Sequence, residues 1–225
     1  MAVLYDIFPH MNGSLPCVVD VETTSTHPIE LLPIYNPSGS DIINFRRVGG
    51  EVIQIALVPL DIHLQPIDQL VFYSNICPEF PELVSQEAMA VNGLNLLDLQ
   101  RTAPSRYKVV QMVENWFASL QLPSDRRLIP IAHNWPFEKT FLQWMFGRES
   151  FEAMFHYLAR DTMQMALMLK DKAAFQCHKQ PFNSVGLASL CKHYNVENEN
   201  PHDALSDCYA QARVLQCLLK EELAL

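Results

Sequence analysis

Asp20 and Glu22 stand two positions apart at the end of an apolar stretch that begins at Cys17. The β-branched residues of this stretch favour a strand, and the side chains at positions 20 and 22 of a strand share one face. Two neighbouring carboxylates repel each other and are costly to bury unless positive charge compensates them, and a divalent cation with oxygen ligands can do so. Alternatively, the strand ends at Asp20 and Glu22 lies in solvent. This stretch alone does not separate the two interpretations.

His202 and Asp207 lie near the start of a helix expected over 203–222. Asp207 continues an apolar, core-facing stripe through Val214 and Leu218, and an inward-facing Asp is usually paired or bound to a metal. Backbone N–H groups at the helix start are the alternative partners of this carboxylate. An imidazole five residues before it, beside an acidic pocket, is suited to act as a general base.

A third acidic residue, Glu138, follows a predicted strand and turn. Pro136 favours a helix start at this point, so Glu138 falls in the first helical turn. The helix dipole alone favours a Glu there, which is the structural alternative to a metal ligand. Asn134, in the preceding turn, is either a cap residue or part of a site.

Three stretches resemble, in order, the three exonuclease motifs of the DEDD superfamily: 19–24 (VDVETT), 132–138 (AHNWPFE) and 202–207 (HDALSD). The His five residues before the last Asp is similar to the DEDDh branch, which includes the proofreading subunit of bacterial DNA polymerase III, ribonuclease T and oligoribonuclease. Weaker similarities near 51–56 and 87–94 extend the resemblance over most of the chain, from Val18 to Leu218.

The resemblance implies an α/β, ribonuclease H-like fold and the release of nucleoside 5'-monophosphates from the 3' end of single-stranded nucleic acid. His202 would act as the general base, and Thr23 and Asn134 would bind the substrate. Two Mg²⁺ or Mn²⁺ ions would be held by four acidic residues, namely Asp20, Glu22, Glu138 and Asp207.

The sequence departs from the family pattern at three positions. Glu138 stands where Asp is usual, although some viral members of the superfamily carry Glu there. Ser25 replaces a frequent Gly, and Asn92 stands where many members have His.

The length of the chain and the order of its expected strands and helices predict a single α/β domain over 1–225, with its core at about 15–220. We expect a mixed sheet of about five strands flanked by helices. The first three expected strands, 17–21, 51–59 and 69–74, form an antiparallel start to the sheet. Later strands are expected at 127–132, edge-like or irregular because of Pro130, and at 157–160. Expected helices span 81–90, 105–120, 136–146, 161–174, 184–194 and 203–222. Residues 25–50 are predicted to be a long loop insertion with little regular structure.

The composition of the chain limits the kinds of partner that it can bind. The net charge is −9 and the isoelectric point is near 5.3, which disfavours tight binding along duplex backbone but permits a polynucleotide end held at a metal site. Six cysteines without paired spacing fit reduced thiols in a cytoplasmic protein, and no apolar run is long enough to cross a membrane. A homodimer and a polymerase or replication complex are both open.

Two other functions compete with a DNA exonuclease. The first is an exoribonuclease similar to oligoribonuclease, because DNA and RNA are not distinguished by these motifs. The second is a catalytically impaired module that binds nucleic-acid ends, although all four carboxylates and the His are present. No Gly-rich phosphate loop follows a predicted strand, which argues against a dehydrogenase or a kinase.

Overall fold

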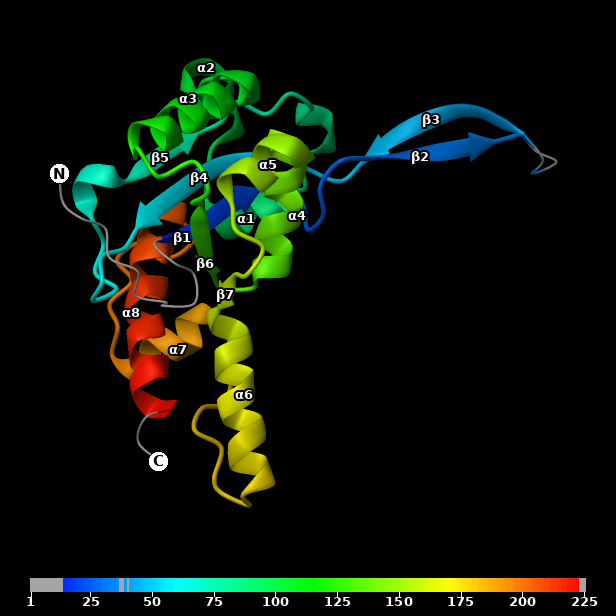
Figure 1. The fold of residues 1–225 in the computed structure, drawn as a ribbon. Coiled ribbons are helices and arrows are strands. Elements are labelled where there is room, and N and C mark those ends of the chain that lie inside the picture. The colour runs from blue at the N-terminus through cyan, green and yellow to red at the C-terminus, as the bar shows by residue number, and fades with distance from the viewer. Residues whose placement is uncertain (1–13, 37–38, 40, 223–225) are drawn as a thin grey trace.

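The computed structural model describes residues 14–36, 39 and 41–222. Its centre is a five-stranded sheet with the strand order β5-β4-β1-β6-β7 (Figure 1). The strands are β1 (Leu15–Thr23), β4 (Val52–Pro59), β5 (Phe72–Asn75), β6 (Leu128–Ala132) and β7 (Arg160–Asp161). β4 pairs antiparallel with both β1 and β5, whereas β6 runs parallel to β1 and β7 runs parallel to β6. The predicted mixed α/β architecture is therefore confirmed.

The alternation of side chains along β1 divides the core into two layers. Cys17 and Val19 pack with the apolar residues of α3 (Arg106–Ser119), α4 (Trp135–Phe146) and α5 (Arg148–Met154). Val18 packs on the opposite face, against α8 (Ala204–Glu222). Asp20 and Glu22 have the same parity as Val18, so they point to the α8 face.

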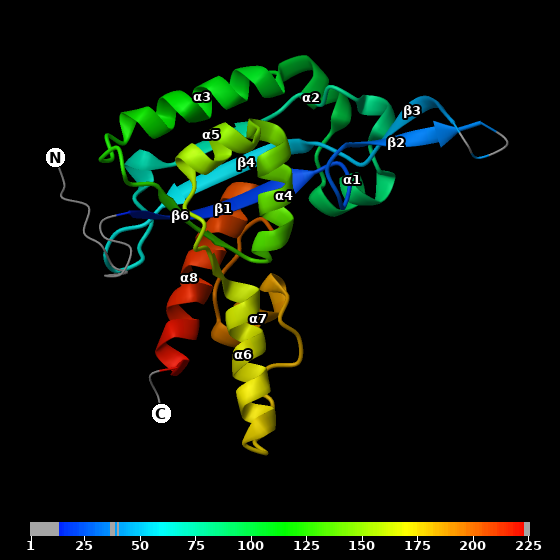
Figure 2. The same ribbon diagram turned by 45° about the vertical axis from the view of Figure 1, so that its right-hand side comes forward.

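The remaining helices complete the two layers, and Figure 2 shows α6 and α7 beside α8, on the side of the sheet away from α3. α6 spans Thr162–Phe175 and α7 spans Leu187–Tyr194. The expected helix at 81–90 is divided into a 3₁₀ turn, Pro81–Leu83, and α1, Gln86–Asn92, because Ser85 caps α1 through the Ala88 N–H. A further 3₁₀ turn spans Asp68–Leu70, where the third strand was expected to begin.

The expected loop at 25–50 contains a β-hairpin, so that prediction is wrong. β2 (Glu30–Tyr35) pairs antiparallel with β3 (Ile42–Val48), and this arm projects away from the rest of the molecule (Figure 1). Pro33 obscured the strand pattern, but proline is tolerated on edge strands and both strands of a two-stranded ribbon are edges. At the base of the arm, Gly49 has φ +93°, and a Cβ there would lie 2.3 Å from the Pro28 carbonyl oxygen. Only glycine fits this close approach.

β6 is a second correction, because all five of its residues are buried and it lies between β1 and β7 rather than at an edge. Pro130 is tolerated because β7 pairs only with Ile131 and Ala132. On that side, Leu128 forms an isolated bridge with Phe155, and Pro130 itself is not paired. Two seven-residue helices, α2 (Leu96–Thr102) and α5, were missed because they are too short to display helical periodicity.

None of the described helices is long and apolar enough to cross a membrane. The six cysteines, all within the described residues, form no disulfide. Three of them, Cys17, Cys191 and Cys208, are buried.

Candidate active site

The carboxylate of Asp20 is buried between β1 and α8. Its side chain is 8% exposed, and Oδ1 accepts a hydrogen bond of 2.6 Å from Nε2 of Gln211. Gln211 is fully buried and follows Asp207 by one helical turn, so both residues face β1 from α8. Its Oε1 has no hydrogen-bond partner among the described residues. A buried amide thus fixes one oxygen of Asp20 while its own carbonyl oxygen stays unpaired in the described structure.

Glu138 reaches the same strand from the opposite layer. Its Oε2 accepts a hydrogen bond of 3.1 Å from the backbone N–H of Val21. The ladder between β1 and β6 ends at Val18, and the chain then turns from β6 into α4. The edge of β1 is therefore open where α4 begins. Glu138, 4% exposed in the first turn of α4, occupies this opening.

Asp207 is fixed on both carboxylate oxygens. Oδ1 accepts a hydrogen bond of 2.6 Å from Nδ2 of Asn198, and Oδ2 accepts one of 3.3 Å from the backbone N–H of His202. His202 has φ +66° and an exposed side chain. One ligand atom from each of Glu22, His202 and Asp207 lies within 4.8 Å of the other two. In the described part of the chain, no other group of His, Cys, Asp or Glu side chains is close enough to hold a metal ion in this way.

The turn that carries His202 is held from β4. Gln54 is buried opposite Glu22 in the β1–β4 ladder, and its Oε1 accepts the Ala204 N–H at 2.7 Å. Its Nε2 donates to the Tyr73 hydroxyl at 2.8 Å, and this hydroxyl donates to Asp203 at 2.9 Å. The first turn of α8 is thereby tied to the sheet.

All four carboxylates are electrostatically strained. Burial raises the pKa of Asp20, and the nearby charges of Glu138, Asp207 and Glu22 raise it further. Burial and the charges of Asp207 and Asp203 raise the pKa of Glu22 to about 8. Burial, followed by the charge of Glu22, raises the pKa of Glu138, and burial raises that of Asp207. Among the described residues, no Lys or Arg forms an ion pair with these groups.

This donor set fits divalent metal ions of the Mg²⁺ type. The ligands are carboxylate oxygens, which hard cations prefer, and an ion would offset the burial and the like charges that raise the four pKa values. Cys177 and His178 do not form a group of this kind with Cys191 and His193 in the described residues.

A cavity of about 320 Å³ opens beside the carboxylates. We call it the terminal pocket; its lining includes Glu22, Thr23, Ser85, Val91, Asn92 and Phe137. The Thr23 hydroxyl donates to the Ser25 carbonyl at 2.7 Å, and Nδ2 of Asn92 donates to the Thr23 carbonyl at 3.3 Å. Asn92 therefore braces the end of β1 from α1.

Asn134 lies in the turn between β6 and α4, outside the lining of the terminal pocket. It has φ +86°, and its side chain makes no capping bond to α4. Its backbone N–H donates to Asp161 at 3.2 Å, as does that of Trp135 at 2.9 Å. Asp161 thus holds the turn that precedes Glu138.

The structure brings together five of the residues singled out from the sequence, namely Asp20, Glu22, Glu138, His202 and Asp207. It adds three supporting amides that were missed, Gln54, Asn198 and Gln211. Only Gln211 left a usable signal, because it follows Asp207 by four residues on the same helix face. Gln54 acts across 150 positions of sequence, and Asn198, nine residues before Asp207, lies in a loop without a periodic pattern.

The sequence model of the exonuclease family, RNase_T, matches residues 17–215. The chain belongs to the exonuclease family. Its site residues fall within the matched region, and the predicted exonuclease family is confirmed. Metal binding is typical of this family, as expected. No curated protein matches the chain in sequence.

Solved structures of nucleases share the fold at low sequence identity. Cell-death related nuclease 4 (CRN-4) has a TM-score of 0.64 and 15% identity, covering 92% of this chain and 64% of that protein. E. coli exonuclease I in complex with a dT13 oligonucleotide has a TM-score of 0.66 and 17% identity, covering 94% of this chain and 42% of that one. The nuclease domain of 3'hExo, a DEDDh family member bound to rAMP, has a TM-score of 0.58 and 16% identity, covering 92% of both chains. The chain thus spans less than two thirds of the first two proteins.

Proposed function

We propose that this exonuclease-family enzyme removes nucleoside 5'-monophosphates one at a time from the 3' end of single-stranded DNA. The observation that carries the proposal is the convergence of Asp20, Glu22, Glu138 and Asp207 from three separate elements, with His202 beside them. Buried carboxylates without basic partners are a costly arrangement that a divalent cation relieves.

The four carboxylates would hold two Mg²⁺ or Mn²⁺ ions. When bound, such a pair lowers the pKa of water and stabilises the negative charge that develops on the attacking and leaving oxygens. Gln211 and Asn198 would keep Asp20 and Asp207 oriented, because each amide occupies one carboxylate oxygen. Glu138 would either give up its hydrogen bond from the Val21 N–H or keep it while its carboxylate binds a metal ion.

His202 would accept the proton of the attacking water. Its side chain is exposed, whereas its backbone N–H is bound to Asp207, so the imidazole can reach solvent and substrate from a fixed backbone position. Only the neutral form has a free acceptor nitrogen, as general-base catalysis requires.

The terminal pocket would receive the 3'-terminal nucleotide. It adjoins Glu22, and Val91 and Phe137 offer apolar surface for a base. Thr23 would contact the terminal nucleotide, and Asn134 would shape the substrate path at the start of α4. A pocket of this size holds a single nucleotide, which favours the binding of chain ends over intact duplex. The net charge of −9 also disfavours binding along duplex backbone.

We further propose that residues 1–225 act as one domain, with the β2–β3 arm as an insertion. Six free cysteines support action in the reducing cytoplasm. A homodimer and association with a polymerase are the two candidate assemblies, and sedimentation of the purified chain tests the first of them.

RNA is the second candidate substrate. Similar folds occur in a protein solved with dT13 and in one solved with rAMP, so the fold is compatible with deoxyribonucleotides and with ribonucleotides. A side-by-side digestion of DNA and RNA oligomers of one sequence, with the products separated by chromatography, decides between them. We expect faster release of deoxynucleoside 5'-monophosphates. Faster release of ribonucleotides would make the enzyme an exoribonuclease, and binding without release in Mg²⁺ would make it an end-binding module.

A further inference from the structure

A second cavity, of about 230 Å³, lies on the other side of α4 from the terminal pocket. We call it the aromatic cavity; its lining includes Arg127, Trp135, Lys139, Phe151, His156 and Tyr157. Its volume is below the range of roughly 300–1,000 Å³ that is typical of small-molecule sites. It is better suited to a flat ring than to a large ligand.

The rings of this cavity are arranged as a stacking surface. Tyr157 is 79% exposed, and its ring lies on that of His156 with the centroids 4.7 Å apart and the planes 23° apart. Trp135 lies against Phe151 in a similar way, at 6.2 Å and 23°. An exposed ring that is supported from behind offers its free face to another planar group, and nucleic-acid bases stack on such faces without sequence preference.

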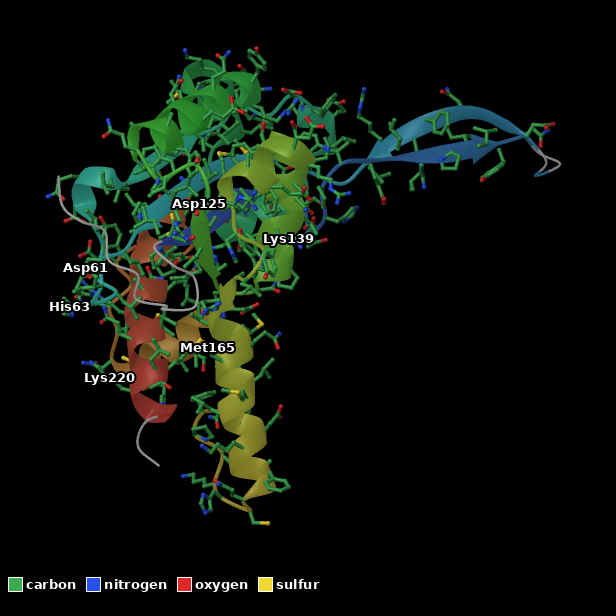
Figure 3. All side chains as sticks on the ribbon, viewed as in Figure 1. Asp61, His63, Asp125, Lys139, Met165 and Lys220 are labelled. Atoms are coloured by element: carbon green, nitrogen blue, oxygen red, sulfur yellow. The ribbon has the colours of Figure 1, made fainter. Side chains whose placement is uncertain are left out.

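The cavity also carries positive charge in an acidic protein. Arg127 and Lys139 are exposed, and neither forms an ion pair with any described residue. The carboxylate in the lining, Glu152, is bound to Arg148 at 2.8 Å. Figure 3 labels Lys139 on α4. Two uncompensated cations beside stacked rings match the chemistry of a nucleotide, with its phosphate and its base.

The first turn of α4 connects this cavity to the active site. Phe137 lines the terminal pocket and Trp135 lines the aromatic cavity. These two residues are about 200° apart around a helix, and Glu138 lies on the face that points to the carboxylates. A helix is only about 10–12 Å across with its side chains. One short strand can therefore extend from the terminal pocket, past Glu138, to the aromatic cavity.

We propose that the aromatic cavity binds a nucleotide upstream of the scissile bond, with its base on Tyr157 and its phosphates near Arg127 and Lys139. This inference rests on the proposed function, because it assigns the path of the same substrate strand. It predicts that the enzyme gains affinity from nucleotides that never reach the metal site.

The test compares a dT dodecamer with a dT trinucleotide as substrates of Tyr157→Ala. The matched control is Tyr107→Ala, since Tyr107 is also an exposed Tyr, 69% accessible, on α3 and outside the lining of the aromatic cavity. Loss of one stacking contact should raise KM for the dodecamer by about 5–100-fold, with kcat unchanged. The trinucleotide should be digested as by the wild type. A dodecamer KM equal to that of the wild type, or equal losses on both substrates, would overturn the inference.

The cations are tested by salt dependence. Lys139→Gln should reduce the slope of log binding constant against log salt by about 0.7 for the dodecamer, as expected when one phosphate contact to a single strand is lost. Lys108→Gln, also an exposed lysine, should leave the slope unchanged. Binding is measured by fluorescence anisotropy in EDTA, so the binding constants can be compared even if the wild type digests neither substrate. Absence of digestion by the wild type would contradict the proposed function. Wild-type binding by both Tyr157→Ala and Lys139→Gln would instead overturn the assignment of the aromatic cavity.

Discussion

Glu22→Gln should make the metal-free protein more stable, and increasingly so as the pH rises. Glu22 has an ordinary pKa of 4.5, which the folded structure raises to about 8. The folded state therefore binds this proton more tightly than the unfolded state, and stability falls as the pH rises from about 4.5 through 8. Glutamine has the same shape and no charge, so the variant lacks this loss.

The size of the effect follows from the two pKa values. At about 1.4 kcal/mol per pH unit, the interval between 4.5 and about 8 corresponds to an upper limit of about 5 kcal/mol at high pH. Part of this loss of stability has already occurred at pH 5.5, and solvent at the partly exposed Glu22 side chain reduces the remaining electrostatic effect. We expect the stability gap between variant and wild type to grow by roughly 1.5–3 kcal/mol between pH 5.5 and 8.5, or about 3–12 °C in Tm for a domain of this size.

The assay is thermal unfolding in EDTA across this pH range, repeated with Mg²⁺. A ligand at one hundred times its Kd stabilises the folded state by about 2.7 kcal/mol, so Mg²⁺ should raise the wild-type Tm by roughly 5–10 °C and the Tm of Glu22→Gln much less. Glu199→Gln, an exposed Glu outside the carboxylate cluster, is the control and should follow the wild type. A stability gap that is constant with pH, or an undiminished Mg²⁺ effect in Glu22→Gln, would refute the electrostatic account.

Three further substitutions test individual roles. Asp207→Ala should abolish Mg²⁺-dependent digestion while its circular dichroism spectrum stays that of the wild type; near-normal turnover would remove Asp207 from the metal site. His202→Ala should lower kcat by roughly 10²–10⁴, the usual contribution of a positioned base, and a loss of only a few-fold would assign the proton to another group. Gln211→Met should weaken Mg²⁺ binding by about 10–100-fold in calorimetry, because Asp20 loses its 2.6 Å hydrogen bond. Unchanged affinity would show that this amide does not orient Asp20.

The sequence predicted those parts of the fold that rest on strong local patterns. The β-branched run before Asp20 and the apolar stripe below Asp207 indicated β1 and α8, and strand alternation placed Asp20 and Glu22 on one face. The order of the acidic residues along the chain and their family resemblance indicated one site. The packing of α8 on that face of β1 brings Asp207 to the two carboxylates, as expected.

Other features depend on contacts that local patterns do not reveal. The β2–β3 arm was missed because prolines and glycines dominate its ends, and a two-stranded ribbon buries too little to display a strong pattern. Gln54 looked like an ordinary strand residue, yet it binds Ala204 across 150 positions of sequence. The bond from Val21 to Glu138 exists only because the β1–β6 ladder ends early, which depends on the register of two distant strands.

The central proposal is that four carboxylates act through divalent ions on the 3' end of a strand. The most direct measurement is a time course on a 5'-labelled single-stranded DNA oligomer, with Mg²⁺ or EDTA, and with a second oligomer whose 3' hydroxyl is blocked. We predict stepwise shortening from the 3' end in Mg²⁺ only, release of nucleoside 5'-monophosphates, and no shortening by Asp20→Asn. Shortening from the 5' end, cleavage within the oligomer, or full activity of Asp20→Asn would contradict it.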